Sequence, residues 1–158
     1  MKKTLIVMLL GLGFIGTQLH AEIISFNNLS ANSLRRVLST TYGTTIAKDG
    51  DLKVSTGDGG CIWIRVITVG KKKILRVYSR YSRYEKRTTS EMILLANQWN
   101  DQKRLLRVAI DPKDGSMTCD YYMICVKGLD SDNLSETVKW FFSLKEDWNN
   151  FAINGGDE

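Results

Sequence analysis

The sequence predicts an α+β domain in which helices pack on one antiparallel sheet, in the order α-β-β-β-α-β-β-α. Three observations support this prediction. Apolar residues recur every three or four positions in three separate segments, which is typical of helices. Segments in which apolar and polar residues alternate lie between them, which is typical of strands. The turns between these strands are short, so they favour hairpins over the long crossovers of a parallel sheet.

The first 21 residues have the layout of a secretory signal peptide. Two lysines precede an apolar run at residues 5–15, and the small residue Ala21 stands at a suitable cleavage point. A membrane anchor is the alternative, but a span needs about 20 apolar residues and this run is shorter and interrupted by glycines. We therefore expect a cleaved signal at residues 1–21, a single domain at residues 22–158, no stable membrane span after cleavage, and a periplasmic or secreted protein.

The expected mature chain lacks the residue that most often performs acid–base and metal chemistry. Removing residues 1–21 leaves 137 residues and lowers the net charge from +5 to +3, because two lysines are lost. The single histidine, His20, is lost as well. Its loss argues against Ser-His-Asp and Cys-His catalysis and against histidine metal sites. The sequence also lacks a calcium loop and a phosphate-binding loop, so we expect no metal and no cofactor.

Three cysteines, Cys61, Cys119 and Cys125, limit the disulfides that an exported chain could form. Cys119 and Cys125 fall on the same face of one predicted strand, roughly 20 Å apart at about 3.3 Å per residue. A disulfide requires Cα atoms within about 7 Å, so these two cysteines are not expected to pair. Any bridge within the chain must use Cys61. Three buried, unpaired thiols are the alternative.

The first half of the chain is predicted to form a helix and a meander of about three strands. The helix follows Ser30 or Asn32, either of which can cap it, and ends near Tyr42. Two short extended segments flank the Asp-Gly turn at residues 49–50, and two longer strands flank the Gly-Lys turn at residues 70–71. The first helix is thus followed directly by hairpin-connected strands.

The second half is predicted to form a helix, two strands and a last helix. Thr88 and Glu91 have capping-box spacing at the start of the first of these helices. Two strands flank a turn at residues 111–115, and Asn133 with Glu136 can start the last helix. The apolar stripe of the last helix consists of Leu134, Val138, Phe141, Leu144, Trp148 and Phe151.

These residues resemble the YbjN-like family of bacterial proteins, described as sensory transduction regulators. The resemblance rests on Asn97-x-x-Asn100, an Asp/Gly turn, Lys127-Gly128-Leu129 and the last amphipathic helix, and the element order matches from Ser30 onward. It implies a fold similar to type III secretion chaperones, without an established chemistry. The signal peptide is a departure, since many relatives are cytoplasmic, and it puts an intracellular signalling role in doubt.

Asn97 and Asn100 flank Trp99 near the end of the middle helix. Asparagine near a helix C-terminus can bond the last carbonyl groups or end the helix, and this structural role is the favoured interpretation. The alternative is an amide pair that binds the backbone of a partner peptide. All three residues are therefore candidates for partner binding.

The segment from Lys71 to Arg87 carries eight basic residues, one acid and three tyrosines. Arg76, Tyr78 and Arg80 alternate along a predicted strand, so they would point the same way and form a candidate binding surface. A solvated strand that protects a sheet edge is the favoured interpretation. An anionic partner is the alternative. Nucleic acid fits the pattern of basic and aromatic residues but is disfavoured by export.

Trp140 and Phe142 widen the apolar face of the last helix beyond its core stripe. Core packing is the favoured interpretation, and a ligand groove or homodimer contact is the alternative. We therefore expect a non-enzymatic, exported, chaperone-like or regulatory module that binds a protein or peptide. The alternatives are a small envelope enzyme that uses acidic residues or a free cysteine, and a binder of anionic surfaces. A deep pocket with two convergent acids would favour the enzyme.

Overall fold

The computed structural model describes residues 22–103 and 105–156, so the predicted signal peptide lies outside the described residues. The helices are η1 (Phe26–Asn28), α1 (Ala31–Leu38), α2 (Thr89–Gln102) and α3 (Ser131–Asn154). The strands are β1 (Ile23–Ser25), β2 (Gly43–Ile46), β3 (Leu52–Ser55), β4 (Cys61–Val69), β5 (Lys72–Tyr81), β6 (Arg107–Ile110), β7 (Met117–Cys125) and β8 (Gly128–Asp130). Within this part of the chain, no helix combines the length and apolarity needed to cross a membrane.

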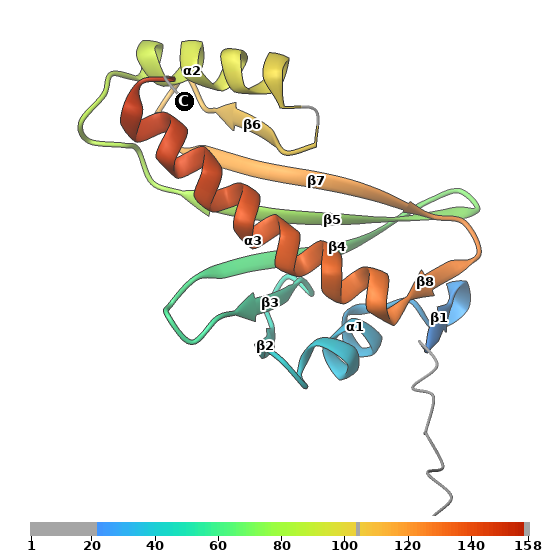
Figure 1. The fold of residues 1–158 in the computed structure, drawn as a ribbon. Helices are drawn as coiled ribbons and strands as arrows, with labels where there is room; N and C mark the ends of the chain where they lie inside the picture. Colours follow the sequence, from blue (N-terminus) through green and yellow to red (C-terminus); the bar gives the residue numbers. More distant parts are fainter. Residues whose placement is uncertain (1–21, 104, 157–158) are drawn as a thin grey trace, which may run out of the picture.

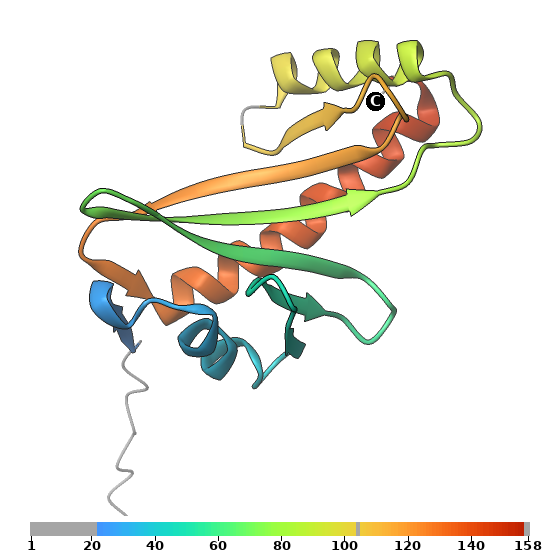
Figure 2. The same ribbon diagram turned by 180° about the vertical axis from the view of Figure 1, so that it is seen from behind.

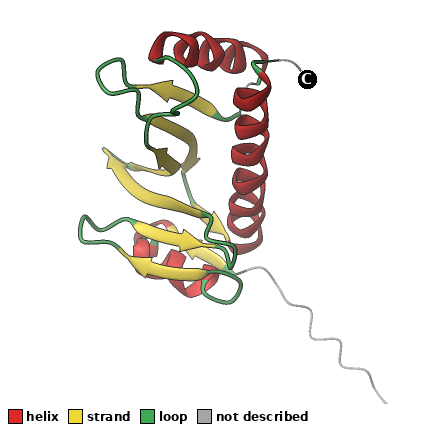
Figure 3. Ribbon diagram, turned by 90° about the vertical axis from the view of Figure 1, so that its left-hand side faces the viewer, coloured by secondary structure: helices red, strands yellow, loops and turns green. Residues whose placement is uncertain are grey.

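Six of the strands form one antiparallel sheet in the order β2-β3-β4-β5-β7-β6, and β1 pairs separately with β8. The α+β prediction is therefore confirmed. The helix α3 runs along one face of the sheet, while α1 and α2 lie at its opposite ends (Figures 1 and 3). Viewed from behind, β4, β5 and β7 lie in front of α3, and no described helix crosses them (Figure 2).

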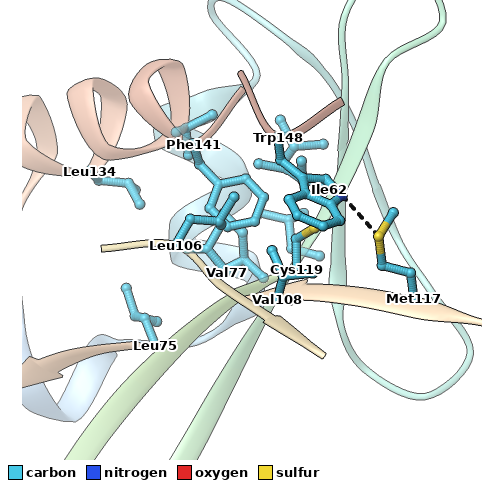
Figure 4. Packing of buried hydrophobic residues seen from close by; sticks show 14 of the residues in the cluster. Ile62, Leu75, Val77, Leu106, Val108, Met117, Cys119, Leu134, Phe141 and Trp148 are labelled. Atoms are coloured by element: carbon cyan, nitrogen blue, oxygen red, sulfur yellow. Dashed lines mark hydrogen bonds between the residues drawn. The ribbon is translucent and has the colours of Figure 1, made fainter. Parts of the chain in front are cut away.

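The hydrophobic core fills the space between the sheet and α3. Alternate residues of the long strands point toward the helix, so the core side of the sheet is apolar while its other side is free to carry polar groups. Figure 4 shows Phe141 and Trp148 of α3 above this layer, with the Trp148 indole nitrogen 2.8 Å from the Met117 sulfur. The core strand residues drawn there include Ile62, Leu75, Val77, Val108 and Cys119, all of which are buried.

Side chains at the start of each long helix bond to the first free backbone N–H groups. Ser30 caps α1 and Thr88 caps α2 in a reciprocal capping box with Glu91, as predicted. Asp130 caps α3 by accepting bonds from the backbone N–H groups of Asp132 and Asn133. The last helix therefore begins before Asn133, the residue predicted to start it.

The structure differs from the prediction in three further respects, two in the strands and one in the first helix. The first meander has four strands, because both short segments around residues 49–50 form strands of their own. The pair β1–β8 was not predicted, since three-residue strands have almost no period to detect. The first helix also ends earlier than Tyr42, at Leu38.

Candidate functional site

The open face of the sheet, which we define as the side of β4, β5 and β7 opposite α3, has an ordered pattern of side chains. Strand pairing places them in rows across the three strands, because directly paired residues point to the same side. One row is Ile67, Ile74 and Ile124; the next is Arg65, Arg76 and Tyr122; the third is Trp63, Tyr78 and Asp120. An apolar row therefore adjoins two rows of charged and aromatic residues.

Asp51, in the turn before β3, anchors one side of the charged rows. Its carboxylate accepts a bond from Arg65 Nε at 2.7 Å and another from the Tyr78 hydroxyl. A second nitrogen of Arg65 lies 3.0 Å from the exposed carboxylate of Asp49. Asp51 is almost fully buried, so its charge is balanced within the protein by Arg65.

Asp120 of β7 anchors the other side in the same way. Arg76 donates to its carboxylate at 2.8 Å, and the Tyr122 hydroxyl lies 3.4 Å from the same oxygen. Arg65 and Arg76 are direct cross-strand neighbours, a pairing of like charges that is unfavourable by itself. One buried carboxylate beside each guanidinium offsets this repulsion.

Tyr78 lies at the centre of the cluster and is shielded from water by the side chains around it. The guanidinium carbons of Arg76, Arg80 and Arg65 lie 4.7, 5.3 and 6.0 Å from its ring centre, and Trp63 stacks on the ring at 6.0 Å. Burial, with a smaller contribution from the bond to Asp51, raises the pKa of Tyr78 to about 12. Its phenol therefore stays protonated at neutral pH and donates to Asp51.

Arg80 gives the open face an uncompensated positive charge. It is exposed and makes no ion pair with a described residue, whereas Arg65 and Arg76 are each paired with a carboxylate. The bond to Asp51 and the attraction of its charge hold the pKa of Arg65 above its ordinary value, so this side chain remains cationic. The cluster thus presents basic groups around an aromatic centre.

The apolar row continues to the exposed end of the face. Ile124 is 62% exposed and Tyr122 is 46% exposed, and both lie on the part of β7 that extends beyond its pairing with β6. Val69 and Val126, at the ends of the neighbouring segments, are exposed too. Exposed apolar side chains that lie next to one another mark interaction surfaces more often than isolated ones do.

The basic segment predicted from the sequence is only partly a single surface. Arg76, Tyr78 and Arg80 point the same way, as expected, but β5 is a central strand, so the interpretation as an edge-protecting strand is wrong. Lys73 instead donates to the backbone carbonyl of Leu29, and Arg87 bonds the last carbonyl groups of α3. The basic residues from Lys71 to Arg87 therefore do not form one surface, because only some of them lie on the open face.

Asn100 makes a pair of hydrogen bonds with β6 and does not end its helix. Its amide donates to the Val108 carbonyl and accepts from the Val108 N–H, both at 2.8 Å. The helix ends at Gln102 and its C-cap is Lys103, so the predicted capping role is wrong for Asn100. Asn97 is exposed, and Trp99 is buried with its indole N–H bonded to the Leu106 carbonyl. Trp99 is therefore a core residue and is removed from the candidate binding residues.

Trp140 and Phe142 lie on opposite flanks of α3 and are half-buried against the rest of the chain. The Trp140 ring meets Tyr121 edge-on at 5.7 Å, and Phe142 stacks on Tyr42 at 5.9 Å. They do not form one groove. Each instead extends the core to one side, which favours the packing interpretation of this helix.

A sequence model of the YbjN family, described as "Putative bacterial sensory transduction regulator", matches residues 30–152, from the cap of α1 almost to the end of α3. The chain belongs to the YbjN family. No curated protein matches it. The family description indicates a regulatory or binding role, in agreement with the resemblance noted from the asparagines, the turn and the last helix.

The surface cavities formed by the described residues bear on the enzyme alternative, for which two convergent acids in a deep pocket are expected. Three surface cavities are each lined by a single acid, Glu85, Asp147 or Asp130. The described cysteines are unpaired, and burial raises the pKa of Cys119 to about 12. Across the described residues, no group of three or more potential metal ligands is found.

Proposed function

We propose that this YbjN protein is an exported regulatory protein that binds a partner protein through the open face of its sheet. One observation carries the proposal: the isoleucine row lies next to the arginine cluster around Tyr78, on a sheet face that no described helix covers. Arginine, tyrosine and tryptophan are the residues enriched at the energetic centres of protein interfaces. Export is supported by the layout of residues 1–21.

The cluster is organised before any partner arrives. Arg65 and Arg76 are held by ion pairs, and both also contact the Tyr78 ring, so these two side chains have little freedom left to lose on binding. The isoleucines supply apolar area that a partner would remove from water at about 25 cal/mol per Å². Together these features favour a partner of defined shape over nonspecific adhesion.

The charges indicate which partner segments would fit. Arg80 makes no ion pair with a described residue, and Lys53 and Arg107 extend the third row at its two ends. Asp51 and Asp120 are buried beneath. A segment with carboxylates facing the arginines and apolar side chains facing Ile74 and its neighbours would be complementary. A second copy of the chain would instead oppose arginine to arginine, so a homodimer through this face is the weaker alternative.

The proposal is tested by capture of partners from an envelope extract with the immobilised mature protein. The open-face variant carries Arg80→Glu and Ile124→Asp. The control variant carries Arg35→Glu and Leu94→Asp, changes of the same chemistry at exposed positions of α1 and α2. We expect a protein that the wild type and the control retain equally and that the open-face variant retains about tenfold less, a loss of about 1.4 kcal/mol in binding free energy.

Equal retention of every captured protein by the two variants would contradict the proposal. Circular dichroism must show that both variants fold. Sedimentation measures whether the purified wild type forms a dimer. If it does, and the open-face variant is a monomer, the partner is a second copy of the chain. If the mature chain binds nucleic acid and the open-face variant does not, the partner of this face is nucleic acid and not a protein.

A further inference from the structure

A cavity of about 740 Å³ lies away from the isoleucine row, beneath the loop that joins β5 to α2. This loop leaves the end of β5, passes beside the C-terminal end of α3 and enters α2 (Figure 1). Residues 82–86 form its free part, which we call the arch. Cavities of 300–1,000 Å³ are the usual size for small-molecule sites.

The arch is fixed at both ends. Tyr81 pairs with Met117 in the sheet, and Arg87 donates to the carbonyl groups of Ala152 and Ile153 at 2.9 and 3.0 Å. These bonds also serve the last turn of α3, whose final carbonyl groups have no partners within the helix. The space under the arch is therefore held open by the fold itself.

The floor of the cavity is apolar and includes two methionines. Met92, Met117, Trp148 and Ala152 line it, and all four are buried in the core. Methionine side chains are flexible and polarisable, so they adapt to apolar ligands of different shape. Ile153, which is 58% exposed, adds an apolar residue to the lining.

The lining above the floor is cationic. Arg80, Arg83 and Lys86 contribute to it, against the single acid Glu85. Arg83 and Lys86 are exposed and make no ion pair with a described residue. An apolar floor under a positively charged rim is complementary to a molecule with an apolar body and an anionic head.

We propose that this cavity binds a small anionic amphiphile, such as a fatty acid, with its apolar body on the methionine floor and its acidic head between Arg83 and Lys86. The inference does not depend on the proposed function, because the two sites share only Arg80. A chain in a family described as sensory regulators would thereby gain a small-molecule site next to its partner-binding face.

The test is a calorimetric titration of the mature protein with decanoate, below the concentration at which decanoate forms micelles. Decyltrimethylammonium, which has the same chain and the opposite charge, is the ligand control. We expect saturable binding of decanoate and at least about tenfold weaker binding of the cation. Arg83→Gln with Lys86→Gln should weaken decanoate binding about three- to tenfold, since the attraction of an exposed charge is present but reduced by solvent.

Matched variants separate the cavity from the rest of the surface. Arg35→Gln with Lys48→Gln removes two exposed charges elsewhere and should leave the affinity unchanged. Ile153→Asp should weaken decanoate binding, whereas Leu94→Asp, at a position 63% exposed on α2, should not. Both pairs of changes fall on exposed side chains, and circular dichroism checks that each variant is folded.

The position of the ligand is read from the indole N–H signals of the four tryptophans in a two-dimensional NMR spectrum. Trp148 lines the cavity, while Trp63 and Trp140 do not. Decanoate should therefore move the Trp148 signal and leave those of Trp63 and Trp140 in place. The proposal would be overturned if decanoate does not bind or if both ligands bind with equal affinity. It would also be overturned if the arch and control variants lose decanoate affinity equally.

Discussion

Asn100 shows how one side chain can close the edge of a sheet. Strand β6 is the last in the sheet, and its outer backbone groups would otherwise be free to pair with another chain. The amide of Asn100 occupies both groups of Val108, and the Trp99 indole occupies the carbonyl of Leu106. Helix α2 thereby covers this edge with side-chain hydrogen bonds.

We predict that Asn100→Ala lowers the free energy of unfolding by about 1–3 kcal/mol, because two bonds to a partly buried strand are lost at about 1 kcal/mol each. Asn97→Ala, on the same helix and exposed, should change it by less than about 0.5 kcal/mol. Chemical denaturation of the two variants measures both values. Equal effects would show that the bonds to Val108 contribute nothing to stability.

The raised pKa of Tyr78 predicts how the stability of the protein changes at alkaline pH. Its pKa rises from 10.0 to about 12 on folding, so the folded state binds the phenolic proton more tightly than the unfolded state. The resulting stabilisation is complete below pH 10 and is lost as the pH rises toward 12. Tyr78→Phe should therefore lose less stability than the wild type between pH 10 and 12, as measured by urea denaturation. Parallel pH dependence of the two proteins would contradict the assigned pKa.

At the scale of elements, local signals in the sequence predicted more than long-range ones. The capping box of α2, the alternation in β4 and β5, and the turn at residues 70–71 each lie within a few residues, and all three are confirmed. The site depends on pairs that are distant in sequence. Asp51 and Tyr78 are 27 positions apart, and Arg76 and Asp120 are 44 apart.

The sequence could therefore predict the side-chain arrangement of the open face on one strand only, β5. Arg76, Tyr78 and Arg80 share a side of β5 by alternation alone. Register and strand order decide that Arg65, Trp63 and Asp120 join them, and a single sequence fixes neither. The isoleucine row escaped notice for the same reason, because each of its members looks like an ordinary strand residue.

The start of α3 gives a prediction for an element. Asp130 accepts bonds from two backbone N–H groups, whereas Asn133 lies inside the helix with an exposed side chain. Asp130→Ala should lower the free energy of unfolding by about 1 kcal/mol, the usual contribution of a cap. Asn133→Ala should leave it unchanged or raise it slightly, since alanine favours helix interiors. Thermal and urea unfolding of both variants show whether Asp130 or Asn133 caps the start of α3.

For the whole molecule, export predicts the length of the mature chain. Strand β1 begins at Ile23, the second residue after the expected cleavage point, and pairs with β8 next to the start of α3. Cleavage after Ala21 would leave this pairing intact. The intact mass of protein isolated from the periplasm should correspond to a chain that begins near Glu22. Recovery of only the full-length chain, from the cytosol, would contradict export.

Photo-crosslinking in the cell tests most directly whether the open face binds a partner. A photoreactive phenylalanine analogue replaces Tyr122 on the open face or, as the control, Leu94 on α2; both side chains are exposed. We predict a discrete adduct of higher mass from position 122 after irradiation, and none of that mass from position 94. The yield of this adduct should fall when the Arg80→Glu substitution is also present. Absence of an adduct at 122, or the same adducts from both positions, would contradict binding through the open face.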